Sequence, residues 1–288
     1  MTSLKYYNLI LFLIHLVLAI SFSAYFANIN KKYKNKPARG LEFTIRDHEL
    51  TISEDPDTKV STSQWNSIPK KDVSEKTIQT LIILFFMLTA VFHLYYYMTS
   101  TGNYANMIKY GNNYVRWIEY SITSTIMLLI IALSSGVKDV NVYALIMVTN
   151  VAMIAQGQLI EEAIADGRSW IIPMVTGFAL LIAEFGVIVN SFVSRIKEVD
   201  KFLKENPDLS ENGGKGVPKW LYYMIFVLFA FFSSFGFISL WGAYSKVPYE
   251  RVEKMYLIFS LAAKATLGAF LAYGLGQRQT QTQSEENK

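Results

Sequence analysis

Residues 255–267 read Met-Tyr-Leu-Ile-Phe-Ser-Leu-Ala-Ala-Lys-Ala-Thr-Leu and place one lysine, Lys264, in the middle of an apolar run. Lys264 is about ten residues from either end of this run, too deep for its ammonium group to reach polar surroundings. A charge at such a depth in a membrane is costly unless it has a partner, so it marks a functional site. Burial also favours the neutral amine that Schiff-base chemistry requires. We therefore interpret Lys264 as a functional lysine rather than half of a structural ion pair.

Six further apolar runs accompany this one, and each is long enough to cross the roughly 30 Å hydrocarbon core of a bilayer. Of the 288 residues, 52% are hydrophobic, 15% aromatic and only 17% charged, which is too apolar for an ordinary soluble domain. The sequence predicts an all-α membrane protein with seven spans, at about 8–27, 78–98, 115–136, 141–160, 170–193, 220–243 and 255–275.

Two connections between these spans are long. Residues 28–77 form a polar insert in which 41–46 alternate with a period of two before a turn-rich stretch, so we expect a small β-hairpin covering one membrane face. The connection 194–219 contains a glycine-rich run, 212–216, which lacks the spacing of a phosphate-binding loop, and we predict that this run is a flexible linker. We expect residues 1–277 to form one membrane domain, and the Gln-Thr-rich tail, 278–288, to be disordered.

The composition excludes several classes of function. Without cysteine, the chain has no disulfide, thiolate zinc site, iron–sulfur cluster or cysteine nucleophile. The net charge of +4 comes almost entirely from residues outside the apolar runs, and no basic stripe suggests a nucleic acid as partner. The histidines lack the close spacing of a metal-binding motif, so we predict no metal site, and we do not expect an enzyme.

A partner for Lys264 is predicted by comparing depths along the spans. Odd-numbered spans run in the same direction, so the third and the seventh can be compared directly. At 1.5 Å per residue, Glu119 lies roughly 6 to 10 Å into the third span and Lys264 roughly 14 Å into the seventh. Ser260 precedes Lys264 by one helical turn and lies nearly at the depth of Glu119. We therefore expect a carboxylate, a hydroxyl and an amine to meet.

Two histidines are predicted at the same level. His15 lies in the first span, and His93 lies near the end of the second span, which runs in the opposite direction. A single histidine near a helix end is most often a hydrogen-bonded interface residue, and for His93 this interpretation stays open. Two histidines and Glu119 at one depth indicate a polar half-cavity that accepts or stores a proton near pH 7.

Other charged residues allow less definite predictions. Arg116 precedes Glu119 by three residues, and we expect it to anchor the helix or to pair with that glutamate. Glu184 lies deep in the fifth span, where two interpretations stay open: a protonated, hydrogen-bonded carboxyl group, or a step on a proton path. The fourth span ends at three acidic residues that we expect to be solvated, namely Glu161, Glu162 and Asp166.

Two motifs and the layout of the chain point to a known family. The motifs are Arg-Trp-Ile-Glu-Tyr-Ser-Ile-Thr-Ser at 116–124 and Ser-Leu-Ala-Ala-Lys at 260–264. Histidines in the first two spans and a long polar insert after the first accompany them, whereas the aspartate-rich third span usual in microbial pumps is absent. With this pattern, nearly the whole chain resembles the heliorhodopsin family, which implies a rhodopsin-like seven-helix bundle.

The resemblance implies an all-trans retinal joined to Lys264 as a protonated Schiff base, with Glu119 as its counterion and Ser260 as a hydrogen-bonding neighbour. His15 and His93 would then form the proton-accepting group. Further chromophore contacts implied by the resemblance are Tyr120, Ser124, Asn150, Met153, Phe229 and Gly236, although a side chain larger than glycine is expected at the last position.

Two arguments predict opposite orientations in the membrane. The side holding the insert 28–77 and the connection 194–219 is the more basic, which places the N-terminus outside by the positive-inside rule. This difference is small. The resemblance implies a cytoplasmic N-terminus, an extracellular insert and a homodimer in the lipid bilayer, and we adopt this orientation.

The resemblance implies a photoreceptor for sensory transduction. Light is expected to move the Schiff-base proton toward Glu119 and the histidines. If the proton returns from the same side, nothing is transported, and an unidentified signalling partner reads the change of shape in a slow photocycle. The alternative is a light-activated proton-conducting rhodopsin that uses Glu184 or other internal carboxylates. A third class, a lysine-dependent membrane enzyme or an unrelated transporter, predicts no visible colour with retinal.

Overall fold

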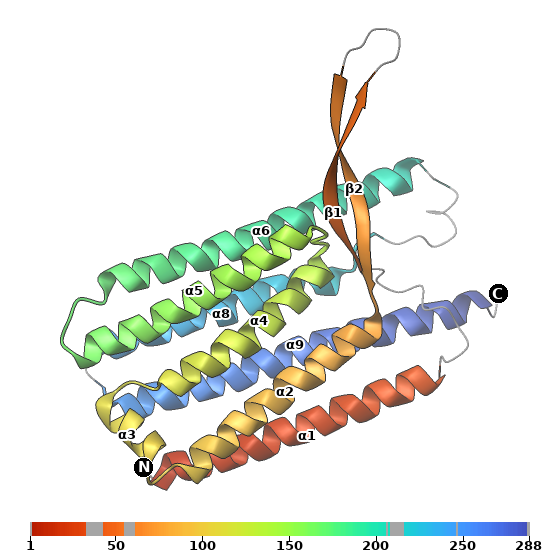
Figure 1. The fold of residues 1–288 in the computed structure, drawn as a ribbon. Coiled ribbons are helices and arrows are strands. Elements are labelled where there is room, and N and C mark those ends of the chain that lie inside the picture. The colour runs from red at the N-terminus through yellow and green to blue at the C-terminus, as the bar shows by residue number, and fades with distance from the viewer. Residues whose placement is uncertain are drawn as a thin grey trace.

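The computed structural model describes residues 2–32, 43–54, 61–205, 207, 216–245 and 247–286 (Figure 1). Within them, seven helices are long and apolar enough to cross a membrane. They are α1 (Thr2–Lys32), α2 (Glu75–Met98), α4 (Tyr114–Ser135), α5 (Val140–Ala165), α6 (Ile171–Glu205), α8 (Lys219–Ser245) and α9 (Tyr249–Glu286). The predicted seven-span helical architecture is confirmed, and it makes the chain an integral, multi-pass membrane protein.

The helices form one bundle in which α4 is the most enclosed member. Neighbouring helices pack in chain order, and α1 also contacts α9, which closes the ring. Helix α4 contacts α2, α5, α6 and α8. The starts of α1, α4 and α9 lie at one end of the bundle, which we call the N-terminal face (Figure 1). A polar residue on α4 is therefore surrounded by protein rather than by lipid.

Local sequence signals determine where α4 begins and ends. The side chain of Asn113 caps the helix, because its Oδ1 accepts a hydrogen bond from the Arg116 backbone amide at 3.2 Å. At the other end Gly136 adopts a φ of 92°, in the left-handed region that favours glycine. Its neighbour in space is Arg195 of α6, whose guanidinium donates to the Ser134 carbonyl at 2.6 Å. These ends fix the positions of Arg116 and Glu119 in the first two turns.

A short helix, α3 (Asn103–Tyr110), lies between α2 and α4 at the N-terminal face. It is not predicted from the sequence because it covers only eight residues, although its buried residues 104, 107 and 108 have helical spacing. Its buried side chains pack against the bundle at the N-terminal face, and they are Tyr104, Met107 and Ile108. The connection between α2 and α4 is therefore part of the core and not a simple spacer.

The insert between α1 and α2 contains the two strands of the structure, β1 (Phe43–Glu54) and β2 (Ser61–Val73). They pair antiparallel, in the segment for which a β-hairpin is predicted. The register shifts beside Pro69, a residue that has no N–H to donate to a strand ladder. Strand β1 contacts α5, so the sheet lies at the end of the bundle opposite the N-terminal face (Figure 1). The turn-forming residues 55–57 lie outside the described residues.

Two helices extend beyond the predicted spans. Helix α6 continues through the first part of the connection 194–219, where Lys138 Nζ pairs with Glu198 at 2.9 Å, whereas residues 212–215 of the predicted linker lie outside the described residues. Helix α9 continues over 278–286, where the sequence analysis expects disorder. Glutamine, arginine and glutamate have favourable helix propensities, which allow the helix to continue outside the apolar span that ends at Gly276.

Replacing Gly136 should destabilise the fold. A Cβ at this position would lie 2.7 Å from Arg195 Cδ, and the left-handed φ adds strain, so we expect Gly136→Ala to lose about 1–3 kcal/mol of stability. Thermal unfolding of the detergent-solubilised protein measures this loss. In the control Gly167→Ala, with a φ of 68° and no atom within 4 Å of the new Cβ, only the strain remains. An equal loss in both variants would remove the contact with Arg195 from the explanation.

Candidate functional site

Lys264 on α9 and Glu119 on α4 form a buried ion pair. Lys264 Nζ donates to Glu119 Oε1 at 3.2 Å and to Ser260 Oγ at 2.8 Å. Lys264 is 2% exposed and Glu119 is 1% exposed, so both charges are removed from solvent and lipid. The predicted meeting of amine, carboxylate and hydroxyl is therefore observed.

The surroundings of the amine are suited to a localised positive charge. The ring of Tyr120 lies 5.3 Å from Lys264 Nζ, at cation–π distance. Tyr120 is itself held by α9, because its hydroxyl donates to the Tyr256 carbonyl at 3.2 Å. The low dielectric of the interior strengthens the attraction between Lys264 and Glu119 and makes either group alone unfavourable.

A cavity opens beside the amine, with about 420 Å³ of empty volume, part of it open to the exterior. Apolar residues make up most of its wall, and polar groups gather at the lysine end. It is lined by Tyr120, Thr123, Ser124, Met127, Met153, Ile154, Phe232, Phe235, Ser260, Ala263 and Lys264.

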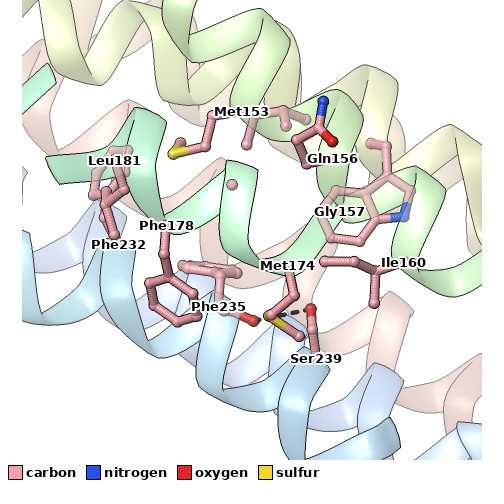
Figure 2. Close-up of a pocket in the computed structure, with 14 residues that line it drawn as sticks. Met153, Gln156, Gly157, Ile160, Met174, Phe178, Leu181, Phe232, Phe235 and Ser239 are labelled. Atoms are coloured by element: carbon pink, nitrogen blue, oxygen red, sulfur yellow. Dashed lines mark hydrogen bonds between the residues drawn. The ribbon is translucent and has the colours of Figure 1, made fainter. Parts of the chain in front are cut away.

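A second cavity continues the first between α5, α6 and α8. The two share Met153, Ile154, Phe232 and Phe235, and Figure 2 shows Met153, Phe178, Leu181 and Phe235 around the second one. Its other lining residues are Trp117, Gln156, Gly157, Ile160, Met174, Gly177, Gly236 and Ser239. Together the two cavities form one elongated apolar cleft that leads away from Lys264.

Gly236 has a steric reason to lack a side chain. A Cβ at this position would lie 2.6 Å from Cζ of Phe178. The aromatic ring of α6 therefore occupies the space in which the resemblance leads one to expect a larger residue on α8. Gly236 lines the second cavity.

The other predicted lining residues divide into three groups. Tyr120, Ser124 and Met153 line the first cavity. Asn150 lies behind the wall and orients it, because its Nδ2 donates to Ser124 Oγ at 2.8 Å and to Thr125 Oγ1 at 2.7 Å. The exception is Phe229.

Phe229 lies outside the cleft, which corrects the prediction made for it. It is 36% exposed on the outer side of α8 and packs against Phe185 of α6. Phe232 and Phe235 line the cleft instead. The reason is the rotation of α8 about its axis, because the residues three and six positions after Phe229 face inward.

His15 and His93 lie together inside the bundle, with ring centroids 5.1 Å apart. Both are almost fully buried, so His93 is not an interface residue. His15 Nδ1 donates to the Leu11 carbonyl at 2.7 Å, and His93 Nδ1 donates to Asn8 Oδ1 at 2.9 Å. With the proton on Nδ1, a neutral imidazole has its lone pair on Nε2. In the described part of the chain, His15 Nε2 has no hydrogen-bond partner.

Arg116 does not pair with Glu119, although this pairing is one of the two roles predicted for it. Its guanidinium instead forms ion pairs with Glu161 of α5 and Glu253 of α9. Side chains on a helix point back toward its N-terminus, which carries the guanidinium of Arg116 away from Glu119 and toward the N-terminal face. Glu161 is buried and not solvated, because it also accepts from Trp117 Nε1 at 2.9 Å.

The other two acidic residues at the end of α5 have different surroundings. Glu162 is partly buried and accepts from Gln158 Nε2 at 2.7 Å. Asp166 is exposed and pairs with Arg168. Glu253 is a residue that the sequence analysis misses, because an acid in the first turns of a span is ordinarily taken to be at the interface.

Glu184 of α6 is buried, and neither of its carboxyl oxygens has a hydrogen-bond partner among the described residues. It does not line either cavity. The structure therefore does not support the hydrogen-bonded carboxyl group, and a step on a proton path stays a prediction.

The fold and the site together define a class of protein. Its seventh span holds a buried lysine, paired with a carboxylate of the third span at the mouth of an apolar cleft, which is the construction of a rhodopsin. The heliorhodopsin family model matches residues 4–275, nearly the whole chain. The chain belongs to this family, which makes it a retinal-binding, light-responsive rhodopsin. A comparison with curated proteins finds no match.

Removing Arg116 should destabilise the protein strongly. Arg116→Met leaves the Glu161 and Glu253 carboxylates buried without their cation, and breaking a buried pair in this way loses about 3–5 kcal/mol. Thermal unfolding measures the change. The matched control is Arg168→Met, which removes a pair whose side chains are 62% and 59% exposed and should lose at most about 1 kcal/mol. Similar losses in the two variants would contradict the buried cluster.

Proposed function

We propose that the protein is a light-sensing photoreceptor in which all-trans retinal is bound covalently, as a Schiff base, to Lys264. One observation carries the proposal: the buried Lys264 amine contacts Glu119 and Ser260 at one end of an apolar cleft. The family assignment supports the retinal, and this contact supports the place of its attachment.

The residues of the cleft fit a long apolar aldehyde. The polar groups are concentrated at the amine, where the aldehyde carbon would be attached with loss of water. Aromatic and methionine side chains line the remainder, including Phe232, Phe235 and Met153. The two cavities have about 420 and 460 Å³ of empty volume, which includes space open to the exterior. Retinal supplies the absorption of light and the isomerisation.

The protein side chains hold the charge and receive the proton. Glu119 acts as the counterion and stabilises the positive charge at the Lys264 nitrogen, while Ser260 accepts a hydrogen bond from it. His15 and His93 form the proton-accepting group, each with an Nε2 lone pair available when neutral.

The difference between the residues on the two sides of Lys264 favours a photocycle without net pumping. Toward the N-terminal face lie the histidines and the ion pairs of Arg116 with Glu161 and Glu253, which we call the Arg116 cluster. The opposite half of the bundle is packed with apolar side chains, among them Leu128, Leu228, Leu267 and Leu271. A proton that leaves toward the histidines therefore returns from the same side, and the response is a change of shape.

Proton conduction is the second candidate function. It is favoured by Glu184, a buried carboxyl group without a hydrogen-bond partner among the described residues. In this alternative Glu184 or another internal carboxylate continues the path toward the far side of the bundle.

The proposed sensor has a defined orientation in the membrane. In our proposal the N-terminus faces the cytoplasm, the insert 28–77 is extracellular, and two copies form a homodimer in the lipid bilayer. A signalling partner then responds to the change of shape, and no substrate is turned over. Labelling of single cysteines, introduced into the cysteine-free chain in the insert and at the N-terminus, tests the orientation in intact cells.

Colour tests the pigment. Reconstitution with all-trans retinal should give a visible absorption band, which Lys264→Ala abolishes because no amine remains to form the bond. Glu119→Gln should shift the band to longer wavelength, since the charge at the nitrogen loses its counterion. Glu162→Gln, at a carboxylate outside this site, serves as the control and should leave the band unchanged. A band that persists in Lys264→Ala would sink the proposal.

Photocurrents distinguish the sensor from the conductor. Under voltage clamp, the sensor should give no sustained current during illumination, and Glu184→Gln should leave the recording unchanged. The purified protein should still bleach and recover its band over the photocycle. A sustained proton current that disappears in Glu184→Gln would establish conduction instead.

A further inference from the structure

A chain of hydrogen bonds connects His93 with the Arg116 cluster, and the proposed function does not use it. His93 Nδ1 donates to Asn8 Oδ1 at 2.9 Å, and Asn8 Nδ2 donates to Tyr104 Oη at 3.2 Å. Tyr104 Oη donates to Glu253 Oε1 at 3.2 Å. The four residues come from α2, α1, α3 and α9, and all of them are buried.

The direction of every bond in this chain is fixed. Glu253 pairs with Arg116 and also accepts from Asn113 Nδ2 at 2.8 Å, so its carboxylate acts only as an acceptor. Tyr104 must therefore donate to it. Both bonds from Nδ2 orient the amide of Asn8, because this nitrogen donates to the Leu4 carbonyl at 3.0 Å as well as to Tyr104 Oη. Its oxygen consequently faces His93, which must donate from Nδ1.

We infer that Glu253 is a positioning residue for the proton-accepting histidines. Acting through Tyr104 and Asn8, it holds the proton of neutral His93 on Nδ1 and leaves the Nε2 lone pair free to accept another. The hydrogen bond at one imidazole nitrogen sets the role of the other nitrogen, as a buried carboxylate does for a catalytic histidine. The source of the incoming proton rests on the proposed function, whereas the position of the proton on His93 does not.

The transfer balances without a further reactant. The N–H bond at the Lys264 nitrogen breaks, and its electron pair stays on that nitrogen. A bond forms between the proton and the lone pair of His93 Nε2. The resulting imidazolium keeps its Nδ1–H on Asn8, at the start of a chain that ends on the negative charge of Glu253.

The chain orients the histidine and does not conduct the proton onward. Transfer through Asn8 would require its amide nitrogen to lose a proton while its oxygen gains one, an unfavourable tautomer. Glu253 is also paired with Arg116, and protonation of the carboxylate would break this buried ion pair. The role of Glu253 is therefore to stabilise charge at a distance.

Nitrogen NMR of the retinal-free protein tests this inference. The chain has three histidines, and His48→Gln leaves His15 and His93, of which His93 is assigned by its loss in His93→Phe. With ¹⁵N-labelled histidine, His93 should show a protonated Nδ1 and an unprotonated Nε2. Tyr104→Phe removes the hydroxyl, so the ratio of the two tautomers should fall about five- to tenfold, the equivalent of one buried hydrogen bond.

The chain offers a closely matched control. Tyr96 is buried and its ring lies 4.8 Å from the ring of Tyr104, but its hydroxyl has no hydrogen-bond partner among the described residues. Tyr96→Phe removes the equivalent hydroxyl group from the neighbouring ring and should leave the tautomer of His93 unchanged. An unchanged tautomer in Tyr104→Phe, or an equal change in Tyr96→Phe, would overturn the inference.

A second measurement uses the protein with retinal. After a flash, transfer of the proton to the histidines should be slower in Tyr104→Phe and unchanged in Tyr96→Phe, as followed by transient absorption. Equal rates in all three proteins would count against Glu253 as a positioning residue. A protein that stays colourless would instead refute the proposed function, while the NMR result from the retinal-free protein would still stand.

Discussion

The structure depends on one constraint: a lysine ammonium in the interior of a membrane bundle needs a negative partner at hydrogen-bond distance. Glu119 supplies it, and the two residues bind α4 to α9 across the centre of the protein. Both side chains are almost fully buried, so this pair is shielded from lipid. The Lys264 amine faces the apolar cleft and forms part of its wall.

Two groups of buried charges lie at different depths, and hydrogen bonds connect His93 to one of them. Lys264 and Glu119 balance one another, whereas Arg116 faces two carboxylates, Glu161 and Glu253. The hydrogen bonds from His93 through Asn8 and Tyr104 end on Glu253, so the histidine pair is tied to the group that contains two carboxylates.

Depth along a span could be predicted from the sequence, but rotation about the helix axis could not. Residue counting was enough to bring Lys264, Ser260 and Glu119 together, because a rise of 1.5 Å per residue fixes height. It could not show that Arg116 turns away from Glu119, or that Phe232 and not Phe229 faces inward, since these depend on how the helices pack. Tyr104 was missed for another reason: it lies on a helix of only eight residues, which is short for a helix to be predicted although its buried residues have helical spacing.

Helix α3 changes how the outer parts of this protein can be treated. Surface connections are usually the places that tolerate fusion partners and epitope tags. The connection that contains α3 carries Tyr104 into the core, and an insertion there would disturb groups linked to the histidine pair. Insertions between β1 and β2 are the safer choice for attaching reporters, because β1 contacts α5 at the end of the bundle opposite the N-terminal face.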